Sequence, residues 1–150
     1  MSNNQEVQSI IENSVLWSMG AAAIPVPIGD FIAVTAVQLD MLKRLSKAMG
    51  KDYQEISARA FILALNSGIS AKIGASLIKG IPGVGTFVGS ISLPIMSAAS
   101  TYSLGNLFVS VIGQYGSLEN IDMHIAKAQF KEFYEVGKTK VEEWKKKGKQ

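Results

Sequence analysis

The chain has 150 residues, of which 47% are hydrophobic and 18% charged, with a formal net charge of +3 and no cysteine. The length fits one domain that buries about two-thirds of the surface its unfolded chain would expose. The lack of cysteine excludes a disulfide scaffold, thiolate metal sites, iron–sulfur clusters and thiol catalysis, and the apolar composition excludes disorder for most of the chain.

The first predicted helix lies near the N-terminus. Asn3 and Asn4 can cap it, and its apolar residues keep helical spacing from Val7 to Leu16. The run Ile24-Pro25-Val26-Pro27 ends it, because proline cannot continue a helix.

This first apolar segment partly resembles a secretory signal. Ala21-Ala22-Ala23 mimics a small-residue cleavage site. However, Glu6 and Glu12 place negative charge where a signal peptide is positive, and no Lys or Arg precedes Lys43. We therefore expect that the protein is not secreted.

A second helix is predicted from about Ile28, with apolar residues at helical spacing from Phe31 to Leu45 and Gly50 as the residue that ends it. Asp30 is the first charged residue of this helix. In a soluble protein Asp30 serves as the N-cap or first-turn acid that the helix dipole favours. Deep in a bilayer the same carboxylate is costly unless it is paired.

The next segment begins with Asp52-Tyr-Gln-Glu55, which has the pattern of a capping box. Helix is predicted to run from there to about Asn66-Ser67-Gly68. A further short helix is predicted to end at Lys79.

No charged residue lies between Lys79 and Glu119, a gap of 39 residues. One continuous helix of that length extends about 58 Å, nearly twice the ~30 Å hydrocarbon core of a bilayer. Gly80-Ile-Pro-Gly-Val-Gly85 predicts a turn, and Pro94 predicts a kink or the start of a new helix. The gap therefore indicates either a helical hairpin or two helices buried in a protein core.

Small residues recur four positions apart in this gap. Gly85 and Gly89 form one such pair, Ser97 and Thr101 another, and Gly105 follows as a weak point. A second helix can approach this face closely. Two interpretations follow: tight packing inside one protomer, or a seam that faces the membrane or another subunit.

The two Ile-Pro breaks resemble an internal repeat. Ile24-Pro25 and Ile81-Pro82 each follow a predicted helix and precede a long apolar one. The pairing suggests two similar helical hairpins, and a chance match of a common dipeptide is the alternative.

Residues 117–150 alternate Lys and Glu with apolar residues, which predicts a long amphipathic helix capped by Ser117 or Asn120. Lys131 with Glu135, Glu142 with Lys146, and Glu143 with Lys147 are spaced for ion pairs worth roughly 0.2–0.5 kcal/mol each. The expected apolar stripe consists of Ile121, Ile125, Phe130, Phe133 or Tyr134, Val141 and Trp144.

The chain ends in a tryptophan beside lysines: Trp144, Lys145, Lys146 and Lys147, with Lys149 beyond. This combination suits an anionic headgroup layer. The alternative is a solvated tail that keeps the protein soluble.

Residues with catalytic chemistry are sparse. His124 is the one histidine, so it would have to carry any histidine metal site or relay, and we interpret it as a surface residue. Asp30 and Asp40 lie roughly 15 Å apart along one helix, too far for a shared reaction centre.

Nucleotide and nucleic-acid sites are also unsupported. The glycines of residues 83–89 lack the preceding strand and the following acid of a dinucleotide loop, and no Gly-Lys-Ser/Thr phosphate loop occurs. Basic residues are diluted by nearly as many acids, so no basic face for nucleic acid is expected. We expect no enzymatic activity, no cofactor and no metal site.

A family resemblance covers roughly residues 15–115. It depends on Ala23-Ile-Pro-Val-Pro-Ile-Gly-Asp30, Ile81-Pro-Gly-Val-Gly85 and several single residues. Those single residues are Gln38, Met41, Leu42, Leu45, Gly50, Thr101, Leu104 and Gly105. The chain resembles a bacterial helical domain family of unknown function, found appended to Era-like or dynamin-like GTPases and in small inner-membrane-associated proteins. The resemblance implies an all-helical module associated with membranes or with a partner GTPase, and it carries no catalytic residue.

Together these patterns predict an all-α bundle of about five to seven helices, built from two Pro/Gly-interrupted apolar hairpins and a long amphipathic C-terminal helix. We expect a single domain, with an apolar helical body over residues 1–116 and a lysine-rich helix over residues 117–150.

The predicted function is a non-enzymatic, membrane-associated and self-associating module at the cytoplasmic face of the cell membrane. The alternative is a soluble homo-oligomeric bundle or an apolar-ligand-binding protein. The expected partners are copies of the chain, an anionic lipid surface and a GTPase. The residues predicted to make membrane or self-association contacts are Pro25, Pro27, Pro82, Gly85, Gly89, Thr101, Gly105, Trp144, Lys145, Lys146 and Lys147.

Overall fold

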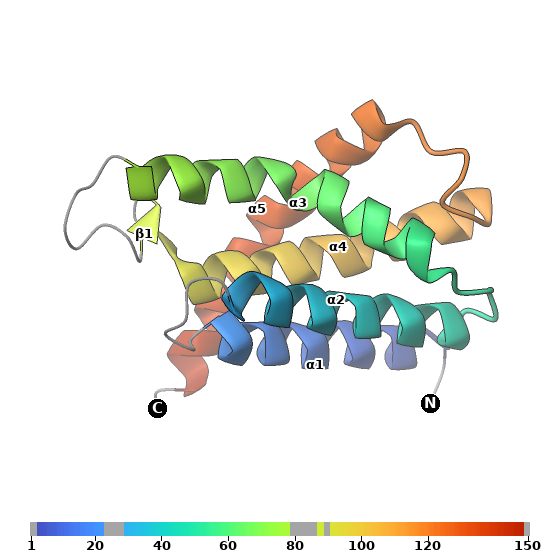
Figure 1. The fold of residues 1–150 in the computed structure, drawn as a ribbon. Coiled ribbons are helices and arrows are strands. Elements are labelled where there is room, and N and C mark those ends of the chain that lie inside the picture. Colours follow the sequence, from blue (N-terminus) through green and yellow to red (C-terminus); the bar gives the residue numbers. More distant parts are fainter. Residues whose placement is uncertain (1–2, 23–28, 79–86, 89–90, 149–150) are drawn as a thin grey trace.

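A computed structural model describes residues 3–22, 29–78, 87–88 and 91–148 (Figure 1). Within these residues it has the helices α1 (Asn3–Ala22), α2 (Gly29–Ala48), α3 (Glu55–Ile78), α4 (Leu93–Tyr115) and α5 (Met123–Gly148). Two short strands, β1 (Phe87–Val88) and β2 (Ile91–Ser92), pair antiparallel with Phe87 opposite Ser92 and Val88 opposite Ile91. The prediction of an all-α bundle is confirmed.

Helix α4 is the central element of the fold. It packs against α1, α2, α3 and α5, and α1 also packs along α2. The two expected hairpins correspond to α1 with α2 and to α3 with α4, and the helices of each pair run in opposite directions (Figure 1). The uncharged helix of the sequence is therefore the helix that the others surround.

The hydrophobic core lies between α4 and its neighbours. Phe61 of α3 and Phe108 of α4 meet edge to face, with ring centroids 6.3 Å apart. Burial of such side chains is the main favourable term in folding, at roughly 25 cal/mol per Å² of apolar surface. The largest side chains buried in the core include Ile11, Val15, Met41, Leu42, Leu45, Ile62, Leu104, Leu107 and Val141.

Helix α2 ends as its sequence predicts. Gly50 has φ +67°, the left-handed conformation that favours glycine. Its N–H donates to the carbonyl of Lys47 at 3.1 Å, and the N–H of Lys51 donates to that of Ser46 at 2.8 Å. These two bonds form a Schellman motif that satisfies the last carbonyls of the helix.

The break expected at residues 66–68 is wrong, because α3 continues unbroken from Glu55 to Ile78. A glycine such as Gly68 costs about 1 kcal/mol inside a helix, which is not enough to end a helix held by packing. The start of α3 also differs from the expected capping box. Helix α3 begins at Glu55, and the carbonyl of Gln54 accepts the N–H of Ala58 at 3.0 Å, so Gln54 and not Asp52 is the N-cap residue.

Helix α5 begins later than expected, because its N-cap is Asp122 and not Ser117 or Asn120. The Oδ1 atom of Asp122 accepts the N–H of His124 at 2.9 Å. Within the helix Glu135 pairs with Lys138 at 2.9 Å, three residues on, in place of the expected Lys131. Ile125 is 52% exposed, so its expected place in the buried stripe is wrong.

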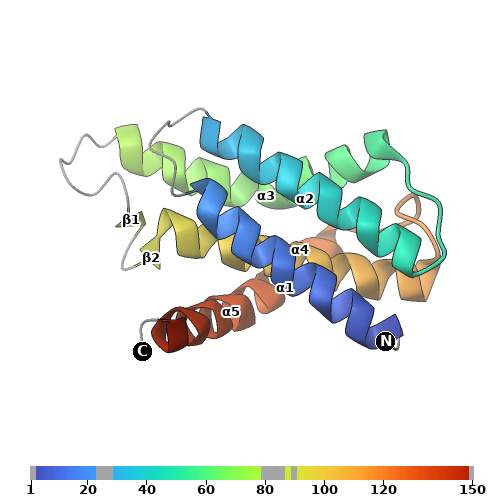
Figure 2. The ribbon, with the colours of Figure 1, turned by 90° about the horizontal axis from the view of Figure 1, so that it is seen from below.

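The helices begin and end at two opposite ends of the molecule (Figures 1 and 2). At one end α1, α3 and α5 finish and α2 and α4 begin. We call it the lysine end, because Lys145, Lys146 and Lys147 lie in the last turn of α5 there. The opposite end holds the start of α1 and α5 and residues 49–54 and 116–122.

Candidate functional site

The residues predicted from sequence fall into two groups. Six of them lie on α4 and α5, which the structure describes: Thr101, Gly105, Trp144, Lys145, Lys146 and Lys147. The predictions for Pro25, Pro27, Pro82, Gly85 and Gly89 lie outside the described residues.

Thr101 belongs to a group of polar side chains buried between α2, α3 and α4. Gln38 Nε2 donates to Thr101 Oγ1 at 3.0 Å and to Ser100 Oγ at 3.3 Å. Ser100 Oγ donates to Asn66 Oδ1 at 2.5 Å, and Asn66 Nδ2 donates to Gln38 Oε1 at 2.8 Å. Gln38, Asn66 and Ser100 thus close a ring of hydrogen bonds across three helices.

This ring fixes how the three helices are placed against one another. Gln38 and Thr101 have no exposed surface, and Thr101 Oγ1 also donates to the carbonyl of Ser97 at 2.9 Å. A buried donor or acceptor that loses its partner costs about 1–3 kcal/mol, so other helix registers are disfavoured. Sequence analysis singled out Thr101 and Ser97 by spacing but assigned no buried role to the amides of Gln38 and Asn66.

Gly105 lies where α4 crosses α1 and α2. A Cβ atom at this position would be 2.9 Å from Ile11 Cγ1 and 3.1 Å from Met41 Sδ. The close approach expected from the small residues therefore occurs, but between helices of one protomer. Thr101 and Gly105 are both buried inside the bundle of one protomer.

Helix α5 packs on α4 through a similar contact. A Cβ atom at Gly137 would be 2.9 Å from Tyr102 Cδ1 and 3.2 Å from the carbonyl oxygen of Ala99. Ser103 Oγ donates to the carbonyl of Phe130 at 2.5 Å, which adds a polar link between the two helices. The lysine-rich helix is thus part of the bundle along its length.

The two tryptophans differ in exposure. Trp144 is partly buried against the core, whereas Lys145, Lys146 and Lys147 beside it are exposed. Trp17 of α1 is 73% exposed. Among the side chains that the structure describes near the lysine end, the exposed aromatic one is therefore that of Trp17, which sequence analysis did not select.

A helical wheel explains why Trp17 is exposed. At 3.6 residues per turn, Leu16 and Trp17 lie about 120–140° around α1 from Ile11. Ile11 is fully buried, and Leu16 is 56% exposed, so the assignment of Leu16 to the apolar face was wrong. The wheel angle was the sequence signal that could have identified Trp17.

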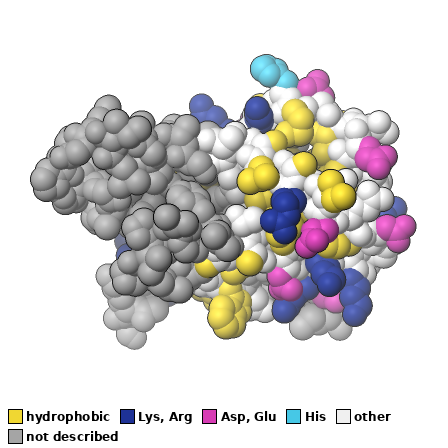
Figure 3. Space-filling model, viewed as in Figure 1, with side chains coloured by type: hydrophobic (Ala, Val, Ile, Leu, Met, Phe, Trp, Pro, Cys, Tyr) yellow, Lys and Arg dark blue, Asp and Glu magenta, His cyan; other side chains and the backbone are white. Residues whose placement is uncertain are grey.

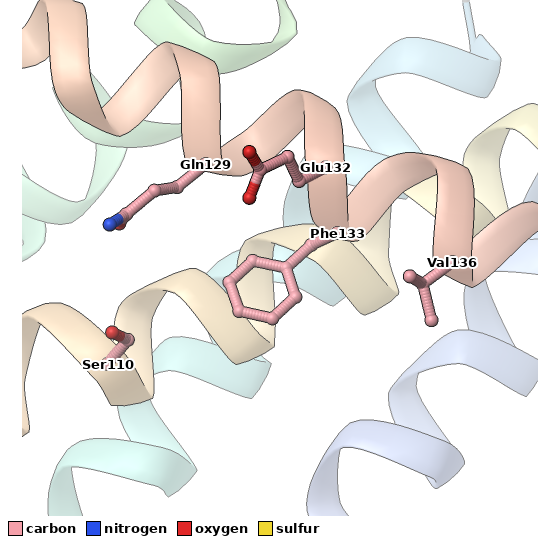
Figure 4. Close-up of a pocket in the computed structure, with 5 residues that line it drawn as sticks. All are labelled: Ser110, Gln129, Glu132, Phe133 and Val136. Atoms are coloured by element: carbon pink, nitrogen blue, oxygen red, sulfur yellow. The ribbon is translucent and has the colours of Figure 1, made fainter.

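Two shallow hollows occur on the described surface. One, of about 240 Å³, is lined by Asn13, Leu16, Trp17 and Gly20 of α1. The other, of about 260 Å³, lies between α4 and α5, where Figure 4 shows Phe133 directed toward α4. Its lining is Ser110, Gln129, Glu132, Phe133 and Val136. Both are smaller than the roughly 300–1,000 Å³ of typical ligand pockets.

The described part of the chain offers little reactive chemistry. Among residues 3–22, 29–78, 87–88 and 91–148, no group of three His, Asp or Glu side chains could hold a metal ion. His124 is exposed, as expected. Burial raises the pKa of Tyr134 to about 12.

Among the described helices, α4 alone is long and apolar enough to cross a membrane, over Pro94–Tyr115. In the structure 72% of its apolar window is buried by the surrounding helices. A core helix of a soluble protein has the same length and composition, so this feature alone does not indicate a membrane span.

One curated protein resembles the chain over most of its length. The chain is 35% identical over 136 residues to magnetosome membrane protein 22 of Magnetospirillum gryphiswaldense, a match that covers 87% of this chain and 70% of that protein. No family model and no solved structure matches the chain.

Proposed function

The chain belongs to the family of magnetosome membrane protein 22, and from this premise we propose that it is a non-enzymatic helical module that associates with a membrane surface. The observation that carries the proposal is the 35% identity to a protein named for a membrane. The exposed Trp17 and Lys145–Lys147 near one end of the bundle supply a suitable surface.

The association is with the surface of the bilayer and leaves the bundle folded. The one helix long enough to span, among those described, holds the core together through Ser100, Thr101 and Gly105. Its withdrawal into lipid would leave Gln38 Nε2 without Ser100 and Thr101, and Asn66 Oδ1 without Ser100. The cytoplasmic face is the proposed side, because its anionic lipids attract lysine.

Self-association is the second part of the proposal. Because Thr101 and Gly105 are used inside one protomer, contacts between copies require other side chains. Ile56 and Leu63 of α3 are 87% and 59% exposed and lie seven residues apart, on one face of the helix. They are the apolar pair on α3 that a second copy would cover.

Two expectations from sequence stay predictions. The partner GTPase is implied by the family resemblance alone, and a pull-down from cells would test it. The lack of catalysis is also a prediction. It would be overturned by reproducible turnover of a substrate that is abolished in Asp30→Asn or His124→Gln.

Vesicle flotation tests membrane association. The purified full chain is mixed with vesicles of phosphatidylglycerol and phosphatidylcholine, or of phosphatidylcholine alone, at low and high salt. We expect flotation with the anionic vesicles at low salt and its loss at high salt, because exposed lysines act through screened charges. Protein that stays at the bottom of the gradient with anionic vesicles at low salt contradicts the proposal.

A soluble homo-oligomeric bundle is the second candidate, and the burial of α4 favours it. It predicts one lipid-independent oligomer in size-exclusion chromatography with light scattering. A monomer that floats with anionic vesicles would reject this candidate.

A further inference from the structure

The two ends of the bundle differ in charge. Each helix can be divided at its midpoint into a half nearer the lysine end and a half nearer the opposite end. The described side chains in the halves nearer the lysine end carry a net charge of +3. Those in the other halves and in the segments 49–54 and 116–122 carry a net charge of −2. The charged residues nearer the lysine end whose side chains the structure describes are Lys138, Lys140, Lys145, Lys146 and Lys147 with Glu142 and Glu143. Acidic residues nearer the opposite end are Glu6, Glu12, Asp40, Asp52, Glu55, Glu119, Asp122, Glu132 and Glu135, and basic residues there are Lys43, Arg44, Lys47, Lys51, Arg59, Lys127 and Lys131. Figure 3 shows basic and acidic side chains intermixed over the described part of one face.

Exposed apolar side chains occur at both ends, and carboxylates lie beside them at both. Glu55 precedes Ile56 at the opposite end, and Glu12 lies one helical turn before Leu16 near the lysine end. The net charges distinguish the two ends, because an anionic surface is attracted by the +3 of the lysine end and repelled by the −2 of the opposite end.

The side chain of Trp17 also suits a lipid interface. Trp17 lies five residues before Ala22, the last residue of α1, in the half of the helix nearer the lysine end. Tryptophan favours this layer because its ring is apolar and its indole N–H can hydrogen-bond.

We propose that the protein binds an anionic lipid bilayer end-on through its lysine end. Trp17 and Leu16 enter the interface, and Lys145, Lys146 and Lys147 contact the phosphate headgroups. The opposite end, with its excess of carboxylates, then points away from the lipid. This inference depends on the proposed membrane association and adds its orientation.

Lipid quenching of tryptophan tests the orientation. Trp144→Phe leaves Trp17 as the single tryptophan, and Trp17→Phe with Trp144→Phe and Tyr115→Trp moves the reporter to an exposed position at the opposite end. Each variant is mixed with vesicles of phosphatidylglycerol and brominated phosphatidylcholine, at a lipid concentration at which flotation shows that variant to be fully bound. We expect bromine to quench Trp17 strongly and the reporter at position 115 weakly.

Two triple variants give an independent test that keeps the same change in charge. Lys145, Lys146 and Lys147 are replaced by Gln in one, and the exposed Lys43, Lys47 and Lys51 in the other. The first should weaken binding to phosphatidylglycerol vesicles by on the order of a hundredfold, and the second by less than about threefold.

The outcomes separate the orientation from the association itself. Stronger quenching at position 115 than at Trp17, or equal loss of binding in the two triple variants, overturns the end-on orientation while flotation of the unmodified chain still supports membrane association. No flotation of the unmodified chain overturns both. Quenching of Trp17 alone, with loss of binding in the first triple variant alone, supports the inference.

Discussion

Replacing Gly105 with alanine tests whether α4 is the tightly packed centre of the bundle. The new methyl group would lie 2.9 Å from Ile11 Cγ1 and 3.1 Å from Met41 Sδ, and both side chains are fully buried. Relief of that overlap requires a shift in a packed core, which costs about 1–3 kcal/mol. The higher helix propensity of alanine relative to glycine offsets up to about 1 kcal/mol of this loss in the free energy of unfolding.

Gly113→Ala is the matched control, because Gly113 lies in the same helix and a Cβ atom there has no neighbour within 4 Å. The propensity gain is common to both variants, so the difference between them isolates the packing cost. We expect Gly113→Ala to raise the free energy of unfolding by up to about 1 kcal/mol. Gly105→Ala should be less stable than Gly113→Ala by about 1–3 kcal/mol.

The assay is urea unfolding of the full chain followed by circular dichroism, with the midpoint and the slope fitted separately. A change in midpoint at constant slope reports stability alone. Equal stabilisation by the two alanines would refute the packing of α4 against α1 and α2.

Three further predictions follow from the same contacts. Gln38→Leu should lower the free energy of unfolding by about 1–3 kcal/mol in urea titrations, because Asn66 Nδ2 loses its acceptor, Gln38 Oε1. As a control, Gln114→Leu at an exposed position should change the free energy of unfolding by less than about 0.5 kcal/mol. Trp17→Ala should shift the urea midpoint little because Trp17 is 73% exposed, yet weaken binding to anionic vesicles; a large loss of stability would show that Trp17 is packed. Because the pKa of Tyr134 is raised from its ordinary value of 10.0 to about 12, its contribution to the free energy of unfolding is fully present below pH 10.0 and is lost as the pH rises to about 12. Tyr134→Phe should therefore make the free energy of unfolding depend less on pH in that window. An unchanged pH dependence would contradict the burial of Tyr134.

Sequence patterns predicted the architecture well where stretches without charge and helix-ending glycine or proline residues are decisive. The 39-residue stretch without charge predicted either a helical hairpin or two helices buried in a core, and its described part instead has the strand pair β1–β2 and one core helix, α4. Gly50 and Pro94 were interpreted as helix boundaries, and both lie at the ends of helices. These signals are local, so they depend little on the rest of the fold.

The site was predicted less well, because its features depend on tertiary contacts. Gly105 was predicted to be a weak point of the helix and a residue for membrane or self-association contacts, but α4 continues through it and its close neighbours are Ile11 and Met41 of the same protomer. The ring of Gln38, Asn66 and Ser100 joins helices far apart in sequence, and each residue alone is typical of a surface. Trp144 was predicted to contact a membrane because it lies beside the lysines in sequence, but the more exposed tryptophan is Trp17.

The most direct test of the central claim, a folded bundle held at a membrane surface, is extraction of the protein from cells. Membranes are collected at low salt, washed with alkaline carbonate and then treated with detergent, and the full chain is measured in each fraction. We predict that the protein sediments with the membranes and is released by carbonate without detergent. Recovery in the soluble fraction at low salt, or retention until detergent is added, would contradict the account.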